Sequence, residues 1–371
     1  MPATRRELLL AMAAGAAASK TVAASNETKP PNILFILSDD HSVPFLGPYG
    51  AKFMSTPNLD RFASQSIRFD RAFTAAPQCV PSRAALMTGR SPISIQMGRF
   101  GLPLPANVTT LPEELGKLGY HTGVCGRYFH LDGVIAPNAV TKAVYDNHHL
   151  QTWAHRVNFK DVSPQTQTAD KFRDFLSQVP EGKPWFFWIN YSDPHHPWDK
   201  DAGHVDPAKV ELPPYLPDLP GVREDLANYC REVERLDGFF GADLAVLEKA
   251  REQDNTIVIF MGDNGLAFPH GKGGLYDPGL HVPLIVNWPG KTKPGASDFL
   301  ISGEDLAPTL IEAAGGTPPA EMTGRSFRNL LGGQSYEPRK YIFASRIHHG
   351  NGAFTRTTKA DEFDLSRCVR S

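Results

Sequence analysis

Residues 32–40 have the sequence NILFILSDD, in which an apolar run leads directly into a polar loop. The run over 32–37 is short and rich in residues that favour β-strands. A strand that is apolar at successive positions is typical of a parallel sheet covered on both faces. We therefore predict a buried parallel strand over 32–37 that ends in this loop.

Strands and helices are expected to alternate along the rest of the chain. A helix should begin after Thr56, since threonine is a favoured N-cap and Pro57 suits the first helical position. Further strands are expected within residues 121–125, 183–191, 256–265 and 282–290, and further helices within 110–119, 169–179 and 223–249. This alternation predicts an α/β fold with a mostly parallel sheet, whose active site lies beyond the carboxyl ends of the strands.

The composition excludes several classes of protein. The chain has 371 residues, with 38 Lys and Arg against 40 Asp and Glu, and a net charge of −2. Without a basic excess it lacks the attraction that holds a nucleic-acid backbone, so no nucleic-acid partner is expected. The cysteines, Cys79, Cys125, Cys230 and Cys368, are too few and too scattered for a disulfide scaffold or a zinc cluster.

Residues 1–29 have the pattern of a secretory signal peptide. Arg5 and Arg6 precede an apolar run over 8–18, which is followed by small and polar residues, and the arginine pair suggests the twin-arginine route. A short amphipathic or disordered N-terminus is the alternative. No other segment reaches the roughly 18 to 20 apolar residues that cross a bilayer. We therefore expect no stable membrane insertion and a protein exported to the periplasm or out of the cell.

Three of the predicted strands are followed by clusters of polar residues. These clusters are Asp39-Asp40-His41, Asp193-Pro194-His195-His196 and Asp263-Asn264-Gly265. The pairs at 39–40 and 263–264 offer only oxygen ligands, which suit calcium or magnesium better than zinc. Adjacent aspartates after a strand can also be caps or solvated turn residues, and it is the second pair that favours a metal site.

A further cluster lies in PQCVPSRAALMTGR, residues 77–90, where Cys79 stands at the start of a helical run. The positive end of a helix dipole lowers the pKa of a thiol, which would make Cys79 a nucleophile. A buried cysteine with no chemical role is the alternative. These residues alone leave both possibilities open.

This stretch resembles the signature of the type I sulfatases, Cys-x-Pro-Ser-Arg followed by a helix of small residues and Thr-Gly-Arg. The resemblance continues through Asp39-Asp40, TPNLDRFA, LGYHTG, the Asp-Pro-His of 193–195 and the Gly-Asp-Asn-Gly of 262–265. It implies an alkaline-phosphatase-like three-layer sandwich with a mostly parallel central sheet. It also implies that a maturation enzyme oxidises Cys79 to formylglycine, whose hydrate is the nucleophile.

The resemblance implies a role for each matching residue. The calcium ligands would be Asp39, Asp40, Asp263, Asn264 and the modified Cys79. Arg83 would orient the hydrate, Lys272 would hold sulfate oxygens, and His195 would contact the sulfate or protonate the leaving group. The second hydroxyl of the hydrate can expel sulfate by collapsing to the aldehyde, so that water need not attack a stable ester.

One stretch departs from the family pattern. Sulfatases of this type carry Gly-Lys-Trp-His after the strand near residue 122, whereas this chain has Gly-Arg-Tyr-Phe-His over 126–130. Arg127 keeps the positive charge without the compact ammonium group, and His130 supplies the imidazole if one residue is inserted. We expect His121 to be a strand-end residue and His41 to line the site or cap its loop.

Residues 263–286 and 343–349 resemble members of the family that remove N-linked sulfate from glucosamine in heparan sulfate. This implies a sulfated carbohydrate of the glycosaminoglycan type as substrate, with the N-sulfate bond as one candidate. His348 and His349 would then contact the sugar, with ordinary surface histidines as the alternative. Two other functions stay open: a phosphonate or phosphodiester hydrolase of the same superfamily, and a truncated, non-catalytic glycan-binding relic.

The expected organisation has three parts. Residues 1–29 form the signal peptide and residues 30–335 the catalytic domain. Sulfatases of this type continue with a small antiparallel sheet and a terminal helix, so residues 336–371 are expected to be the start of an incomplete C-terminal subdomain.

Overall fold

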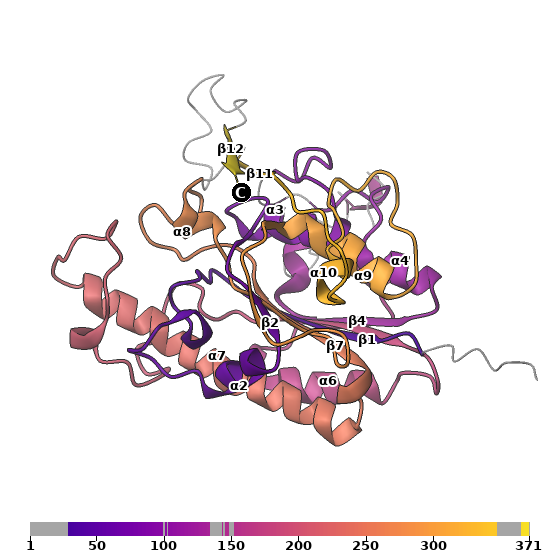
Figure 1. The fold of residues 1–371 in the computed structure, drawn as a ribbon, viewed down its shortest axis with the longest axis horizontal. Helices are drawn as coiled ribbons and strands as arrows, with labels where there is room; N and C mark the ends of the chain where they lie inside the picture. The colour runs from indigo at the N-terminus through magenta and orange to yellow at the C-terminus, as the bar shows by residue number, and fades with distance from the viewer. Residues whose placement is uncertain are drawn as a thin grey trace, which may run out of the picture.

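The computed structural model describes residues 29–98, 101, 103–133, 143, 145–147 and 152–346, and the backbone of 365–370. Residues 1–28 of the expected leader lie outside this part of the chain. A central sheet separates two layers of helices, which makes a three-layer α/β/α sandwich (Figure 1). The predicted fold class is therefore confirmed.

The middle layer is an eight-stranded sheet. In spatial order its strands are β5 (Phe159–Asp161), β4 (His121–Gly126), β6 (Trp185–Asn190), β1 (Asn32–Ser38), β7 (Thr256–Gly262), β8 (Leu284–Asn287), β2 (Ile67–Phe69) and β9 (Gly295–Ser297). The strands from β5 to β7 are parallel, so their carboxyl ends meet at one edge of the sheet. β8 is antiparallel to β7 and β2, because the chain between β7 and β8 stays at the edge where β7 ends.

β1 is buried along its whole length, as its apolar run predicts. Leu34 pairs in register with Phe187 of β6 and with Val258 of β7. Alternate side chains of β1 enter different hydrophobic cores, Ile33 on one face of the sheet and Leu34 on the other. Burial on both faces explains why the strand has no exposed polar positions.

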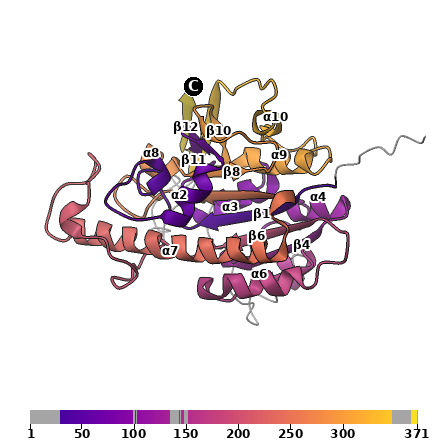
Figure 2. The ribbon, with the colours of Figure 1, turned by 60° about the horizontal axis from the view of Figure 1, so that its bottom comes forward.

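The two helical layers cover opposite faces of the sheet (Figure 1). One layer contains α3 (Cys79–Thr88), α4 (Leu111–Lys117), α9 (Leu306–Ala313) and α10 (Arg328–Leu331), and the other contains α2 (Pro57–Ser64), α6 (Thr168–Leu176) and α7 (Val222–Ala250). The long helix α7 runs beside α6 under the sheet (Figure 2). Within the described residues, no helix combines the length and the apolar character needed to span a bilayer.

Shorter elements complete the fold. β3 (Ala72–Phe73) pairs with β10 (Ile301–Ser302), β11 (Tyr341–Arg346) pairs with β12 (Leu365–Arg370), and α8 (Asp277–Leu280) is a short helix. The 3-10 segments are η1 (Gly47–Tyr49), η2 (Arg127–Asp132), η3 (Trp153–His155), η4 (Gln165–Gln167), η5 (Pro207–Lys209), η6 (Gln253–Asn255) and η7 (Gly303–Asp305). The Ser345 N–H donates to Ala75 O at 2.9 Å, so β11 lies against the segment that leads into α3.

The predicted helix starts agree with the structure. α2 begins at Pro57 after Thr56. α4 begins after Thr110, whose N–H and hydroxyl both donate to the Glu113 carboxylate. The sequence pattern does not predict β5, because this edge strand has the sequence Phe-Lys-Asp and needs less apolar surface than a central strand.

A buried carboxyl group ties α7 to the end of β6. Asp243 Oδ2 accepts hydrogen bonds from the Tyr191 hydroxyl at 2.5 Å and from the Thr168 hydroxyl at 3.1 Å. Burial raises the pKa of Asp243 to about 7, although both hydroxyl groups favour the ionised form. The raised pKa means that Asp243 exchanges its proton near neutral pH.

We expect Asp243→Asn to make the stability of the protein less dependent on pH. The pKa of this carboxyl is about 7 in the folded protein and about 4 in an unfolded chain, so between these values only the folded state keeps the proton. The stability that this group contributes is therefore lost as the pH rises through that window, by up to a few kcal/mol.

Urea unfolding at about pH 5 and about pH 8 measures this effect. The midpoint should fall less between the two pH values in Asp243→Asn than in the wild type. Asp254→Asn, at an exposed position, serves as the control and should follow the wild type. An equal fall in Asp243→Asn and the wild type would contradict the expectation.

Candidate functional site

Three carboxyl groups meet where β1 and β7 end at the same edge of the sheet. Asp39 and Asp40 follow β1, and Asp263 follows β7. The Asp263 N–H donates to Ser38 O at 3.0 Å, and the Asp40 N–H donates to Asp263 Oδ1 at 3.0 Å. Asn264 Nδ2 donates to Asp40 Oδ1 at 2.8 Å. These four predicted oxygen ligands are brought together and fully buried.

Cys79 is the first residue of α3, and its side chain lies against these carboxyl groups. Its Sγ is 3.2 Å from Asp39 Oδ1 and 3.8 Å from Asp40 Oδ1. Burial and the negative charge of Asp39 raise the pKa of the thiol well above its usual value. These effects oppose that of the helix dipole, and the raised pKa favours a protonated thiol in unmodified Cys79 over the low-pKa alternative.

Arg83 lies one helical turn after Cys79, and its side chain has no exposed surface. Its Nε donates to Asp263 Oδ2 at 3.1 Å, and its Nη1 donates to Asn190 Oδ1 at 2.5 Å. Its Nη2 forms an ion pair with Asp39 Oδ2 at 3.2 Å. One guanidinium group therefore connects the ends of β1, β6 and β7.

Two polar residues to which sequence reasoning assigned no role support this arrangement. Ser82 Oγ donates to the Asp263 carbonyl at 2.5 Å and accepts from the Thr74 hydroxyl at 2.7 Å. Asn190, which holds Arg83, also donates from Nδ2 to Cys125 O at 3.2 Å. The available signal for Asn190 was its position as the polar last residue of a buried, otherwise apolar strand.

Two more positively charged side chains approach the cluster, Lys272 from a loop and Arg127 from the start of η2. Lys272 Nζ lies 2.7 Å from Asp40 Oδ1, and Arg127 Nη1 lies 3.0 Å from Asp39 Oδ2. Burial alone would raise the pKa of Asp39, but Arg127 and Arg83 hold this pKa well below its usual value. The side chains of Lys272 and Arg127 are 13% and 23% exposed, which leaves both accessible to a ligand.

Both predicted catalytic histidines lie beside the cluster. His195 Nε2 is 3.8 Å from Asp40 Oδ2, and 28% of the side chain is exposed. His130 lies in η2, and its buried Nδ1 has no hydrogen-bond partner among the described residues. Burial and the charge of Arg83 lower the pKa of His130 well below its usual value. His130 is therefore a neutral imidazole with a free ring nitrogen.

Of the other histidines with predicted places, His41 and His121 are not part of the cluster. His41 is buried, with Nδ1 at 3.1 Å from Ser38 Oγ and Nε2 at 3.1 Å from Phe45 O, so it caps the loop after β1. His121 is the first residue of β4, at the amino end of the strand. His348 and His349, predicted to contact the sugar, lie outside the described residues.

The oxygen cluster fits a hard divalent cation. Burial raises the pKa of Asp40 to about 6 and that of Asp263 to about 7, and the charge of Asp39 adds to both shifts. Asn264 Oδ1 is buried and has no hydrogen-bond partner in the described part of the chain. A cation among these oxygens would favour the ionised carboxylates and give the Asn264 carbonyl a partner. Cys79 Sγ and a ring nitrogen of His195 also lie within 4.8 Å of carboxylate oxygens of Asp39 and Asp40, and the side chain of residue 79 could complete such a site.

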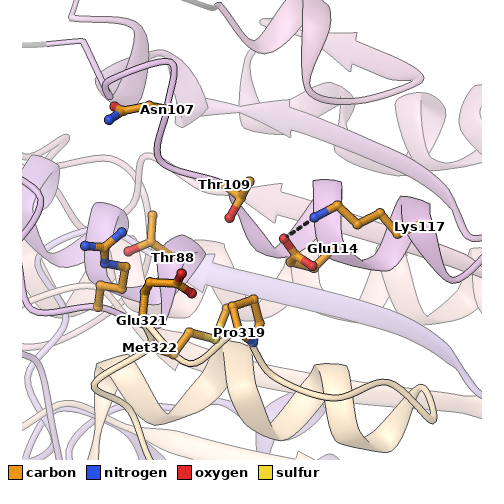
Figure 3. Close-up of a pocket in the computed structure, with 9 residues that line it drawn as sticks. Thr88, Asn107, Thr109, Glu114, Lys117, Pro319, Glu321 and Met322 are labelled. Atoms are coloured by element: carbon orange, nitrogen blue, oxygen red, sulfur yellow. Dashed lines mark hydrogen bonds and ion pairs between the residues drawn. The ribbon is translucent and has the colours of Figure 1, made fainter.

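A separate cavity of about 320 Å³ lies at the other end of α3 (Figure 3). Thr88, the last residue of the helix that Cys79 begins, lines this cavity together with Pro319 and Met322. Lys117 Nζ is 2.6 Å from Glu114 Oε1, so these two charges in the lining neutralise each other. The full length of α3, about 14 Å, separates the cavity from Cys79.

Known proteins resemble this chain along most of its length. The sulfatase family model matches residues 31–316. The human N-sulphoglucosamine sulphohydrolase is 30% identical over 366 residues, which cover 86% of this chain and 69% of that relative. An ulvan-active sulfatase of Formosa agariphila is 29% identical over 350 residues, which cover 85% of this chain and 56% of that relative. The chain thus spans little more than half the length of the second relative.

A solved structure has the same fold. It contains a protein in complex with its substrate D-glucosamine-2-N,6-O-disulfate, and the two chains align with a TM-score of 0.74. The alignment covers 92% of this chain and 87% of that chain, at 19% sequence identity.

We expect added calcium to stabilise the metal-free protein, because the assembled oxygen cluster would bind the cation and the unfolded chain would not. At a free concentration about 100-fold above Kd, the free energy of unfolding should rise by ~2.7 kcal/mol. Asp263→Asn should abolish most of this gain, whereas Asp170→Asn, at an exposed position on α6, should keep it. Thermal unfolding with and without calcium measures the gain, and a full gain in Asp263→Asn would count against this metal site.

Proposed function

The chain belongs to the sulfatase family, and from this premise we propose that it hydrolyses sulfate groups of a sulfated carbohydrate, using calcium and a formylglycine made from Cys79. One observation carries the proposal. Cys79 opens α3 against the buried carboxyl groups, and Arg83, one turn later, contacts both Asp39 and Asp263. The side chain of Cys79, the positively charged guanidinium group of Arg83 and the buried carboxylate oxygens therefore lie next to one another.

Burial raises the pKa of the Cys79 thiol well above its usual value, which favours a nucleophile other than the unmodified thiol. Formylglycine, installed by a maturation enzyme that acts on Cys79, supplies a hydroxyl oxygen once its aldehyde is hydrated. Asp39, Asp40, Asp263 and Asn264 would hold calcium, which would supply positive charge to the nucleophile and the sulfate group. The side chain at position 79 would be a further ligand of that ion.

The cations of this chain would bind and orient the sulfate group. A sulfate ester reacts poorly with water, so the site has to neutralise the negative charge of the sulfate oxygens. Arg83 is immobilised by three partners and can offset charge at the side chain of residue 79. Lys272 and Arg127 are partly exposed and can each turn from a carboxylate toward a sulfate oxygen.

The two histidines would complete the reaction. His195 lies between Asp40 and solvent, where the sugar has to leave, so it is the proton donor to the leaving oxygen or nitrogen. Burial lowers the pKa of His195, which makes its protonated form the stronger acid. The free Nδ1 of His130 is available for a hydrogen bond to the sulfate or to the side chain of residue 79.

The surroundings of the site support a saccharide substrate. We define an aromatic rim by His196, Trp198, Phe268, His270 and Tyr276, which lie on the two loops that carry His195 and Lys272. The Trp198 and Phe268 rings stack at 4.6 Å, and His270 meets Tyr276 edge to face at 5.4 Å. Aromatic rings pack well against the apolar faces of sugar rings.

The relatives suggest which sugars to test first. One relative is by name an N-sulphoglucosamine sulphohydrolase, so N-sulfated glucosamine is the first candidate substrate. Another is active on ulvan, so O-sulfated sugars belong in the same test.

We also propose a processing and domain scheme for the chain. Residues 1–29 direct export to the periplasm or beyond, residues 30–335 form the catalytic domain, and residues 336–371 begin a C-terminal subdomain that contains β11 and β12.

Release of sulfate from defined saccharides tests the proposed reaction. Protein matured in a host with the formylglycine-generating enzyme should release sulfate from a sulfated glucosamine, and mass spectrometry should find an aldehyde or its hydrate at Cys79. Cys79→Ala should abolish release, whereas Cys230→Ala, which alters a buried cysteine on α7, should keep it.

Other outcomes would replace the proposal. Faster turnover of aryl phosphate esters or phosphonates than of aryl sulfates would indicate a phosphoryl hydrolase. Binding of glycan by the matured protein without release of sulfate would indicate a glycan-binding relic.

The aromatic rim leads to a separate prediction about substrate binding. Tyr276 is 60% exposed, and Tyr276→Ala should raise KM for a sulfated saccharide by ~3- to 10-fold through the loss of ring packing. KM for a small aryl sulfate, which does not reach the rim, should stay unchanged. Tyr341→Ala, at a 45% exposed tyrosine on β11, is the matched control. Equal effects on both substrates would argue against a saccharide-binding rim.

A further inference from the structure

Arg235 of α7 makes a two-pronged ion pair with the loop that follows β6. Its Nε donates to Asp193 Oδ2 at 2.8 Å, and its Nη2 donates to Asp193 Oδ1 at 2.9 Å. Its Nη1 donates to Asp199 Oδ2 at 2.7 Å, further along the same loop. A guanidinium group that binds a carboxylate through two parallel hydrogen bonds fixes orientation as well as distance.

Asp193 connects this ion pair to the candidate site. Its backbone carbonyl accepts a hydrogen bond from the Asp39 N–H at 3.1 Å, so Asp193 lies beside the loop after β1. The His195 N–H donates to Ser192 O at 2.9 Å, which makes the segment 192–195 a tight turn. A displacement of Asp193 would therefore move His195 relative to Asp40.

Two other contacts of this turn are uncharged. Gln165 Oε1 accepts from the N–H groups of Ser192 and Asp193 at 2.9 Å and 3.0 Å. The Trp198 ring N–H donates to Pro194 O at 3.0 Å. Neither contact reaches the Asp193 carboxylate, whose side chain is only 4% exposed.

Charge makes Arg235 hard to replace in this position. Glu232, which is 3% exposed, also approaches Arg235, with Oε1 at 3.2 Å from Nη2. Without Arg235, the carboxylates of Asp193, Asp199 and Glu232 would repel one another, two of them largely out of reach of water. A buried carboxylate that loses its partner is strongly destabilised, so the turn would shift toward solvent.

We infer that Arg235 is a positioning residue that holds His195 in place to protonate the leaving group. This inference rests on the proposed sulfatase function and on the role proposed there for His195. Arg235 lies on α7, and its side chain is 28% exposed. It acts on His195 through Asp193 and the turn that carries both residues.

The test compares substrates that differ in their need for a proton. A sulfated saccharide has a poor leaving group and needs the acid, whereas an activated aryl sulfate such as 4-nitrophenyl sulfate does not. Arg235→Gln should lower kcat for the saccharide by about 10- to 100-fold and kcat for the aryl sulfate by less than about threefold. Arg235→Lys, which keeps the charge but not the two-pronged geometry, should restore part of the loss.

Two matched variants complete the design. Arg231→Gln removes a 14% exposed arginine of the same helix, which binds Val205 O and Glu224 instead of the 192–195 turn, and should leave both rates near wild type. His195→Ala should show the same substrate selectivity as Arg235→Gln. The double variant should lose no more than His195→Ala alone, since both changes remove one function.

Three results would overturn the inference: equal losses on both substrates, losses in Arg231→Gln that match those in Arg235→Gln, or additive losses in the double variant.

The ring resonances of His195 in NMR spectra provide a readout independent of activity. They should shift in Arg235→Gln and not in Arg231→Gln, and an unshifted spectrum would also overturn the inference. A wild-type protein that releases no sulfate would instead refute the proposed function, and the NMR comparison would still decide the positioning.

Discussion

The buried guanidinium group of Arg83 is the interaction on which the candidate site depends. It contacts Asp39, Asp263 and Asn190, residues from the ends of three neighbouring strands, and none of its surface is exposed. Carboxylates buried this deeply need a counter-charge, and Arg83 provides one that cannot lose its proton. Because Arg83 lies one turn after Cys79, the same contacts fix where α3 begins and where the cysteine lies.

The site combines a fixed set of charges with a more accessible set. Arg83 is enclosed, whereas Lys272 and Arg127 contact their carboxylates from a loop and from the start of η2 and stay partly exposed. The pKa values of Asp40 and Asp263, raised by burial to about 6 and about 7, indicate a cluster with more acidic groups than its cations fully stabilise. A cluster of this kind is suited to bind a cation and an anionic substrate together.

Several features could be predicted from the sequence because they rest on local patterns. The apolar runs of β1 and β7, the start of α2 after Thr56 and the long amphipathic α7 all follow from residue type and spacing. The direction of β8 and the existence of β5 could not, because both depend on which strands become neighbours. The contacts of Asn190, Ser82 and Arg235 could not be predicted for the same reason, since their partners lie far away along the chain.

The sequence by itself determined the α/β class, the identity of the chemical groups and their places after strands and at the start of a helix. Only the tertiary structure decided how these groups meet. Parallel strands bring Asp39 and Asp263, which are more than 200 residues apart, to one edge of the sheet. Burial at that edge then shifts the pKa values of these groups, and it raises the pKa of the Cys79 thiol despite its place at a helix start. Desolvation and ion pairing act through space, so no local pattern of residues could reveal them.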